Sequence, residues 1–158
     1  MKDESCNMKL MNIFRWMMEE GYYPDYEQKY IQFDIDDDTA VLEYDEDIIS
    51  VRMFFTIDEE AYDMFLEASN STMIETYAVK SAVLGNMTLL MFSCEFMCDN
   101  LKDFRRFFPR ALNRIKEAVS AHKSEMKKLI LASEVASATI PATDESMAGI
   151  DIRQKVLS

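Results

Sequence analysis

The sequence predicts an α+β fold on an antiparallel sheet, in the order helix, three strands, helix, two strands, helix. Residues 31–57 alternate apolar and polar side chains in short runs separated by acidic turns, which is typical of half-buried strands. Gly85 and Asn86 join two further apolar runs, as in a two-residue hairpin turn. Residues 101–132 instead repeat apolar side chains at helical spacing. Because the strand connections are short, neighbouring strands are expected to be antiparallel.

Length and composition indicate one domain followed by a tail. The chain has 158 residues, of which 49% are hydrophobic, so a conventional core needs no metal or disulfide. We assign residues 1–132 to a single domain and residues 133–158 to a C-terminal linker and tail. Around Pro141 the composition shifts to Ala, Ser and Thr, and periodicity is lost. Residues 150–158 are interpreted either as a loose end or as a segment that docks on this domain or a neighbour.

The first helix is predicted to start after Ser5 or Asn7, either of which can serve as its N-cap, and to run to about Glu20. Its polar side chains fall on one narrow stripe, so the broad apolar remainder needs more than one neighbour. Gly21 is well placed to end the helix, because glycine enters the left-handed region without penalty.

Three strands of a meander are predicted next, at residues 31–35, 39–44 and 48–57. Successive side chains of a strand point to opposite faces, so Arg52 and Phe54 are expected on the outer face of the third strand. The core face of that strand is predicted to carry Ile49, Val51, Met53, Phe55 and Ile57.

A second helix is predicted from Glu59 to about Ala68, with Asp58 as its N-cap. Acidic residues in its first turn are favoured by the helix dipole. We expect the helix to end at the polar residues 69–71. Its core side is predicted to consist of Ala61, Tyr62, Phe65 and Leu66.

The second arm of the hairpin is apolar on both faces, which indicates a strand that is covered on both sides. One of these faces has no predicted helix to cover it. Exposed thioether and aliphatic side chains accept varied partners, and Phe54 adds an outward aromatic ring in the preceding meander. We therefore identify a candidate partner-binding surface made of Met87, Leu89, Met91, Met97 and Phe54.

The last helical region is predicted to open at Asp99 or Asn100 and to run to about Ala132. Pro109 lies inside it. Because proline cannot donate to the carbonyl of Arg105 and crowds that group, we expect a short turn before Pro109 and the main helix after it.

Residues that carry catalysis or bind metals are sparse in this sequence. His122 is the only histidine and is interpreted as a packed or surface residue, while Cys6, Cys94 and Cys98 are interpreted as small buried hydrophobes. The acidic residues 34–38 lack the glycine that a calcium loop requires. The three glycines are too isolated for a phosphate-binding loop. We expect no enzymatic activity, no catalytic residues, no cofactor and no metal site.

The net charge of -12 is unevenly distributed along the chain. Residues 101–128 hold nine basic and three acidic residues, a balance of +6, so the remainder carries -12 - 6 = -18. An acidic majority repels anions. The basic last helix is interpreted as a partner for the acidic turns within the chain or between subunits, and nucleic-acid binding is not expected.

The sequence also bears on localisation. No apolar run approaches the roughly 18 residues of a membrane helix. The first residues carry acids where a secretory signal carries bases. We therefore expect a cytoplasmic protein with no membrane partner.

The predicted order resembles the type III secretion chaperone-like fold, and in particular the bacterial YbjN-like domain. Local features agree: the first helix ends at Gly21, the meander spans 30–57, and the second helix ends near Asn70. A strand containing Lys80 follows, and the resemblance covers residues 8–128. It implies a curved antiparallel sheet with the first and last helices packed on one face. It also implies an acidic homodimer that holds an extended client segment through apolar patches, and a non-enzymatic, regulatory role.

The leading hypothesis is a non-enzymatic protein-interaction or chaperone-like, regulatory domain, present as a homodimer, that binds a peptide or protein partner through an apolar surface. An alternative is a small-ligand-binding or enzymatic domain whose pocket lies between the first helix and the sheet, lined by Trp16, Tyr22 and Tyr77. The second alternative is nucleic-acid binding through the basic last helix. Each hypothesis places the binding surface on a different part of the chain.

Overall fold

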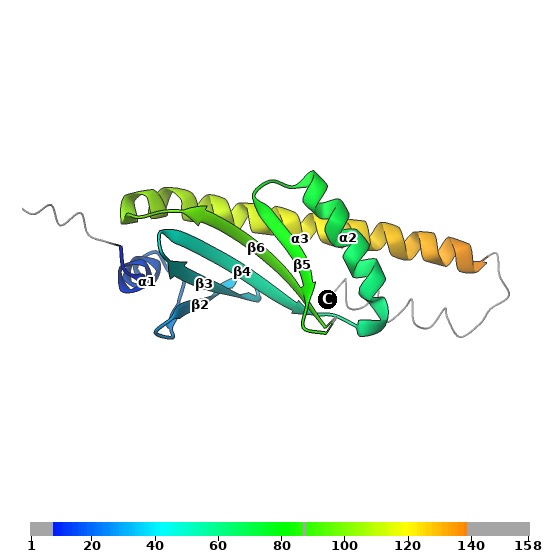
Figure 1. Ribbon diagram of the computed structural model, residues 1–158, viewed down its shortest axis with the longest axis horizontal. Coiled ribbons are helices and arrows are strands. Elements are labelled where there is room, and N and C mark those ends of the chain that lie inside the picture. The colour runs from blue at the N-terminus through cyan, green and yellow to red at the C-terminus, as the bar shows by residue number, and fades with distance from the viewer. Residues whose placement is uncertain (1–7, 87, 139–158) are drawn as a thin grey trace, which may run out of the picture. The chain divides into compact units, whose positions relative to one another are not determined.

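The computed structural model describes residues 8–86 and 88–138, and the predicted order of elements is confirmed within them (Figure 1). The elements are α1 (Leu10–Glu19), β1 (Asp25–Tyr26), β2 (Tyr30–Ile35), β3 (Asp38–Asp45), β4 (Ile48–Thr56), η1 (Glu59–Ala61), α2 (Tyr62–Glu75), β5 (Val79–Leu84), β6 (Leu89–Met97) and α3 (Leu101–Ala138). The strands form one six-stranded antiparallel sheet in the order β1-β2-β3-β4-β6-β5. The two-residue β1 is an addition that the sequence did not predict.

The chain divides into two compact units. The first unit consists of residues up to 54 together with 78–80 and 92–115, and the second of residues 55–77, 81–91 and those from 116 onward. β5, β6 and α3 each contribute residues to both units.

In the first unit, α1 begins at Leu10 with Lys9 in the N-cap position. The backbone N–H of Lys9 donates to Asn12 Oδ1 over 3.0 Å. A side-chain oxygen in the first turn thus satisfies the backbone amide of the N-cap residue. The start is later than predicted. Ser5 and Asn7, the two predicted caps, lie outside the described residues.

The end of α1 confirms the predicted glycine cap. Gly21 has a φ of 82°, and its amide donates to the carbonyl of Met18 over 3.2 Å. The amide of Tyr22 donates to the carbonyl of Met17 over 3.0 Å. These two bonds satisfy carbonyls that a helix end otherwise leaves without partners.

The meander is antiparallel, as the short connections between its strands predicted. Phe33 is paired with Ala40 and Leu42 with Val51, and all four side chains are buried. Residues 46–47, which join β3 to β4, have φ values of 44° and 68°. Positive φ at both central positions matches the twist of a two-residue hairpin.

An aromatic cluster attaches α1 and the start of α3 to the same face of β2. The ring of Trp16 packs edge-on against Phe104 and Phe108, with centroids 5.4 Å and 5.9 Å away. The ring of Phe108 also packs on Phe33 of β2 and on Tyr22, with centroids 5.6 Å and 5.4 Å away, respectively. The first and last helices therefore share one face of the sheet in this unit, as expected.

In the second unit, α2 continues to Glu75, so the predicted end at residues 69–71 is wrong. The hydroxyl of Thr72 donates to the carbonyl of Ala68 over 2.7 Å, which lets a buried polar residue continue the helix. The buried side chains of η1 and α2 are Ala61, Phe65, Ala68, Ser69 and Thr72. The predicted core residues Tyr62 and Leu66 are instead half-buried and exposed, respectively.

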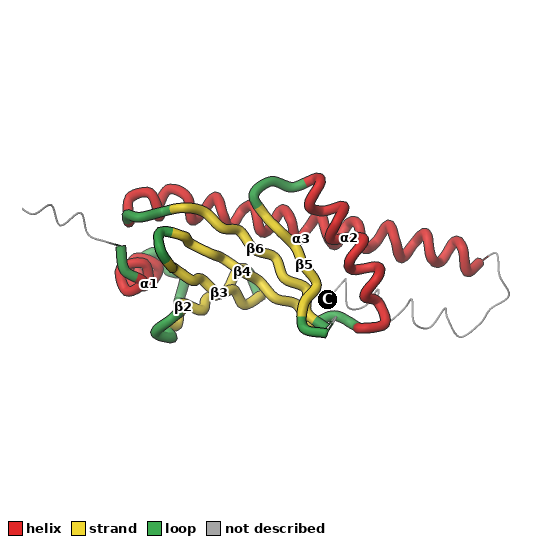
Figure 2. The backbone as a smooth tube through the Cα atoms, viewed as in Figure 1, coloured by secondary structure: helices red, strands yellow, loops and turns green. Residues whose placement is uncertain are grey.

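α3 is one uninterrupted helix, so the predicted turn before Pro109 is wrong (Figure 2). Burial of Phe104 and Phe108, which precede the proline in the helix, offsets the free-energy cost of the hydrogen bond that proline removes. The predicted cap is confirmed at the start, where Asn100 Oδ1 accepts from the amide of Asp103 over 2.8 Å. The helix also passes the expected domain boundary at residue 132, and residues 139–158 lie outside the described chain.

The hairpin turns at the predicted residues. Gly85 and Asn86 have φ values of 62° and 56°, which L-residues with bulky side chains rarely adopt. β6 starts only at Leu89, so the loop is longer than the predicted two residues. In the described part of the chain, no helix combines the length and apolar character needed to span a membrane.

Candidate functional site

The residues of the predicted partner-binding surface fall in both units. Phe54 on β4 and Met97 at the end of β6 belong to the first unit and are 42% and 79% exposed. Leu89 is half-buried and Met91 is buried, and both belong to the second unit. Met87 lies outside the described residues. Phe54 and Met97 are therefore the exposed members of the prediction.

A third exposed apolar side chain lies next to Met97. The amide of Cys98 donates to the carbonyl of Asp47 over 2.7 Å, which pairs the end of β6 with the start of β4. This register places Met97 opposite Ile48, whose side chain is 45% exposed. Sequence reasoning missed Ile48 as a surface residue, although strand alternation places it on the side of Arg52.

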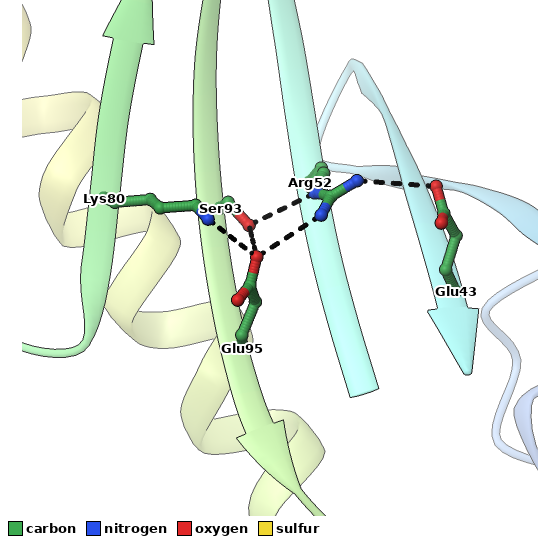
Figure 3. Close-up of polar contacts among 5 residues, drawn as sticks. All are labelled: Glu43, Arg52, Lys80, Ser93 and Glu95. Atoms are coloured by element: carbon green, nitrogen blue, oxygen red, sulfur yellow. Dashed lines mark hydrogen bonds and ion pairs between the residues drawn. The ribbon is translucent and has the colours of Figure 1, made fainter. Parts of the chain in front are cut away.

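A row of charged side chains crosses the same sheet face in the first unit (Figure 3). Arg52 on β4 contacts Glu43 of β3 at 3.6 Å and Glu95 of β6 at 3.3 Å. Glu95 also pairs with Lys80 of β5 at 2.9 Å. Ser93 accepts a 3.4 Å bond from Arg52 Nε and donates to Glu95 Oε1 over 3.3 Å. Charges of alternating sign thus join four strands, and we name these five residues the ionic ladder.

The ion pairs of the ladder are weak because their side chains are partly exposed to solvent. A hydrogen bond from Lys80 lowers the pKa of the Glu95 carboxyl, with Arg52 adding to the effect and partial burial opposing it. The side chains of Lys80 and Glu43 are about half exposed. Exposed ion pairs contribute roughly 0–1 kcal/mol each, so the ladder orients side chains more than it stabilises the fold.

Ser50 lies beside the ladder and has an unusual environment. It is paired in register with Glu43 and is 7% exposed. Its hydroxyl has no hydrogen-bond partner among the described residues. Leaving a buried hydroxyl without a partner costs roughly 1–3 kcal/mol. Polar groups on this face are therefore not all satisfied from within the chain described.

The first-unit outer face is defined by the ladder and its apolar neighbours. Its residues are Glu43, Ile48, Ser50, Arg52, Phe54, Lys80, Ser93, Glu95 and Met97. The sequence reasoning missed the ladder, because ion pairs between strands depend on register. The signal available was charged residues at alternate positions of otherwise apolar strands.

The residues of the alternative ligand pocket have different surroundings. Trp16 is buried and Tyr22 is half-buried, and both belong to the aromatic cluster under α1. Burial, together with the charge of Glu20, raises the pKa of the Tyr22 hydroxyl. Tyr77 belongs to the second unit and is exposed. Trp16 and Tyr22 thus fill space in the core of the first unit.

His122 is packed inside the second unit, in agreement with the packed alternative. Its Nε2 lies 3.2 Å from the Ser69 hydroxyl and 3.4 Å from the carbonyl of Phe65, and its ring stacks on Phe65. Burial lowers the pKa of His122 to about 4. The imidazole is therefore neutral at physiological pH and enclosed.

Cys94 and Cys98 are buried, as predicted. Burial raises the pKa of both Cys94 and Cys98, so neither is an activated nucleophile. Cys6 lies outside the described residues. In the described ranges, no three His, Cys, Asp or Glu side chains gather closely enough to hold a metal ion.

The second unit has a hollow that sequence reasoning also missed. It has a volume of about 340 Å³ and is open to solvent. Its lining consists of three acidic residues and three apolar ones, namely Glu60, Asp63 and Glu67 and Ala61, Met64 and Leu129. The signal in the sequence was the spacing of the three acids along one side of a helix.

Comparisons with known proteins place the fold. No family model matches the sequence, and no curated protein matches it. Among solved structures, the chain is similar to YbjN from E. coli, a proposed transcription regulator, with 11% identity and a TM-score of 0.63 over 75% of this chain and 94% of YbjN. An uncharacterised protein from Methanothermobacter thermautotrophicus is similar with 13% identity and a TM-score of 0.55, over 75% of this chain and 96% of that one. These likenesses show that the chain has a YbjN-like fold.

Proposed function

We propose that this protein is a non-enzymatic regulatory domain that binds a protein or peptide partner on the first-unit outer face. The observation that carries the proposal is the exposure of Ile48, Phe54 and Met97 around the ionic ladder. Fully burying one such side chain contributes roughly 1.5–3 kcal/mol. A partner that covers all three therefore gains a useful part of its binding energy from this face.

The ladder suits the role of an alignment element. Lys80 and Glu43 at its two ends keep about half of their side-chain surface in water. Charged groups at the edge of an apolar contact favour partners with complementary charges and disfavour others. The partner is accordingly a segment with apolar side chains that flank charges of both signs.

The chemistry of the remaining groups supports a non-enzymatic role. His122 is enclosed and neutral, and the thiols of Cys94 and Cys98 are buried. A general base needs access to its substrate, and a thiol nucleophile needs a lowered pKa. The similarity to YbjN, a proposed transcription regulator, supports a regulatory role at the level of the fold.

An array of immobilised peptides tests the proposal. The peptides vary in the number of apolar residues at alternate positions and in the sign of the charges between them. We expect the protein to be retained by the apolar peptides with mixed charges. The double variant Phe54→Lys/Met97→Lys should lose at least about tenfold in affinity, because two buried apolar contacts are replaced by charge.

Tyr23→Lys provides the matched control, because Tyr23 is 90% exposed and lies outside the first-unit outer face. This variant adds the same kind of charge and should bind as the parent does. Retention that is equally weakened in both variants, or absent in the parent, contradicts the proposal.

A further inference from the structure

The hollow in the second unit combines carboxylates with apolar surface. Glu60 of η1 and Asp63 and Glu67 of α2 supply the carboxylates. Met64 of α2 and Leu129 of α3 contribute apolar lining, and both are half-buried. The volume of about 340 Å³ falls within the range of ligand pockets, roughly 300–1,000 Å³. The hollow is therefore large enough to hold a few side chains of a polypeptide segment.

The carboxylates of this hollow have no positive charge beside them. Glu60, Asp63 and Glu67 are exposed and form no ion pair with any residue that the structure describes. Like charges four positions apart on a helix repel each other, as those of Asp63 and Glu67 do. An occupant that carries positive charge together with aliphatic side chains complements both the acids and the apolar lining.

The chain itself contains a segment with this chemistry. Residues 150–158 hold two bases and one acid, a balance of +1, and the bases Arg153 and Lys155 lie between Ile152 and Val156. Residues 139–149 hold two acids and no base, and residues 1–7 hold one base and two acids. Of these three segments, only residues 150–158 combine a positive balance with aliphatic side chains.

The connection from α3 is long enough for this segment to reach the hollow. Ala138 lies nine residues beyond Leu129 on α3, a distance of about 14 Å along a helix. Residues 139–149 cover up to about 36 Å when fully extended. A segment joined to its site by a short connection has an effective concentration on the order of millimolar. A weak contact with the hollow is therefore sufficient to hold it.

We propose that residues 150–158 of the same chain bind in this hollow. The two basic side chains of the segment pair with the carboxylates, and its aliphatic side chains cover the apolar lining. The same carboxylates repel the acidic residues 139–149, so the contact is specific for the later part of the tail. This contact uses the second unit and does not depend on the proposed function, which uses the first-unit outer face.

Limited digestion of the full chain with trypsin tests the proposal, because trypsin cleaves after Arg153 and Lys155. Cleavage requires the segment to leave the hollow, so its rate follows the fraction of unbound segment. Mass spectrometry should show at least about fivefold slower cleavage at these two sites than in a free peptide of residues 146–158. The variant Asp63→Asn/Glu67→Gln should restore most of the rate of the free peptide, because the ion pairs are lost.

The matched control is Glu27→Gln/Asp37→Asn, which neutralises two exposed acids outside the hollow. It changes the net charge by the same amount and should leave the cleavage rates unchanged. Circular dichroism of each variant reports whether it is folded.

A second measurement reports on the hollow directly and leaves every described residue unchanged. The variant Arg153→Glu/Lys155→Glu reverses the charges of the segment, so the segment should leave the hollow. The methyl resonances of Met64 and Leu129 in the NMR spectrum should then shift relative to the parent. The methyl resonances of Leu42, which is buried in the first unit, should stay in place.

Three outcomes overturn the proposal. The first is a parent that trypsin cleaves as fast as the free peptide. The second is slow cleavage that persists in Asp63→Asn/Glu67→Gln, or methyl resonances that do not respond to the reversed segment. The third is protection that disappears on dilution, because the segment then binds a second copy instead of its own chain. Protection that is independent of protein concentration supports the contact within one chain.

Discussion

Burial governs the acid–base behaviour of single residues in this protein. His122 lies against Phe65 and Ser69, where desolvation lowers the pKa of the imidazole to about 4, although the hydrogen bond with the Phe65 carbonyl and the charge of Glu125 oppose this shift. On the solvent-exposed face of the sheet, the hydrogen bond from Lys80 instead lowers the pKa of the Glu95 carboxyl. The first effect penalises the charged form and the second favours it.

The lowered pKa of His122 predicts a loss of stability in mild acid. In the unfolded chain the imidazole takes up a proton near pH 6.5, whereas in the folded protein it does so only near pH 4. Between these values protons bind preferentially to the unfolded state, so the free energy of unfolding falls as the pH falls. The total loss is on the order of 3 kcal/mol by pH 4, and the imidazole contributes no pH dependence above pH 7.

Urea unfolding at a series of pH values measures this effect. The variant His122→Gln keeps a polar group near Ser69 but does not titrate. Other groups titrate alike in the two proteins, so the stability difference between them isolates the imidazole. We expect that difference to change by on the order of 3 kcal/mol between pH 7 and pH 4. Parallel pH profiles would show that His122 titrates normally.

At the scale of elements, tertiary contacts extend helices past residues that interrupt them locally. α2 continues through Ser69 and Thr72, which are 1% exposed. The Ser69 carbonyl accepts a 3.2 Å bond from the Ser81 hydroxyl, and the Thr72 hydroxyl bonds within the helix. α3 continues through Pro109. In each case, buried neighbours outweigh an unfavourable local preference.

Pro109 predicts a stabilising substitution in α3. Pro109→Ala restores an amide that can donate to the carbonyl of Arg105 and removes the ring that crowds it. The side chain is exposed, so no packing is lost. We expect the free energy of unfolding, measured in urea, to rise by about 1–3 kcal/mol. Some of this gain is offset because alanine leaves the unfolded chain more flexible.

Asn113→Ala is the matched control, because Asn113 is exposed in the same helix and the change improves helix propensity alone. It should raise stability by no more than about 0.7 kcal/mol. If Pro109→Ala is no more stabilising than this control, the proline is not a strained position in α3.

For the whole molecule, the net charge of -12 sets the balance between attraction and repulsion. The ionic ladder pairs charges locally, but the acidic turns of the meander concentrate charge of one sign. A large net charge opposes the compact state. Salt reduces this repulsion, because the Debye length at about 0.1 M is about 10 Å.

Net charge predicts that added salt stabilises the monomer. At a protein concentration at which the chain is monomeric, the thermal midpoint should rise between about 0.02 M and 0.5 M NaCl. Salt also weakens the ion pairs of the ladder, which makes the rise in midpoint smaller. The variant Glu95→Gln removes the ion pairs with Arg52 and Lys80, so its thermal midpoint should rise more steeply with salt. A midpoint that falls with salt would mean that the ladder and other favourable pairs outweigh the net repulsion.

Local sequence was sufficient for the order of elements and the inward faces of the meander. Alternation, helical spacing and the turn residues Gly21, Gly85 and Asn86 act over a few residues, and the structure confirms what they predict. It was also sufficient to identify Phe54 and Met97 as outward side chains. Their role in binding a partner stays a prediction.

Long-range packing was required for the rest. The length of α2 and the continuity of α3 depend on burial among segments distant in sequence, which overrides local preference. The ionic ladder joins Arg52 to Glu95, 43 positions apart, and depends on strand register. Periodicity reports which side chains share a face, whereas the neighbours of that face depend on the folded chain.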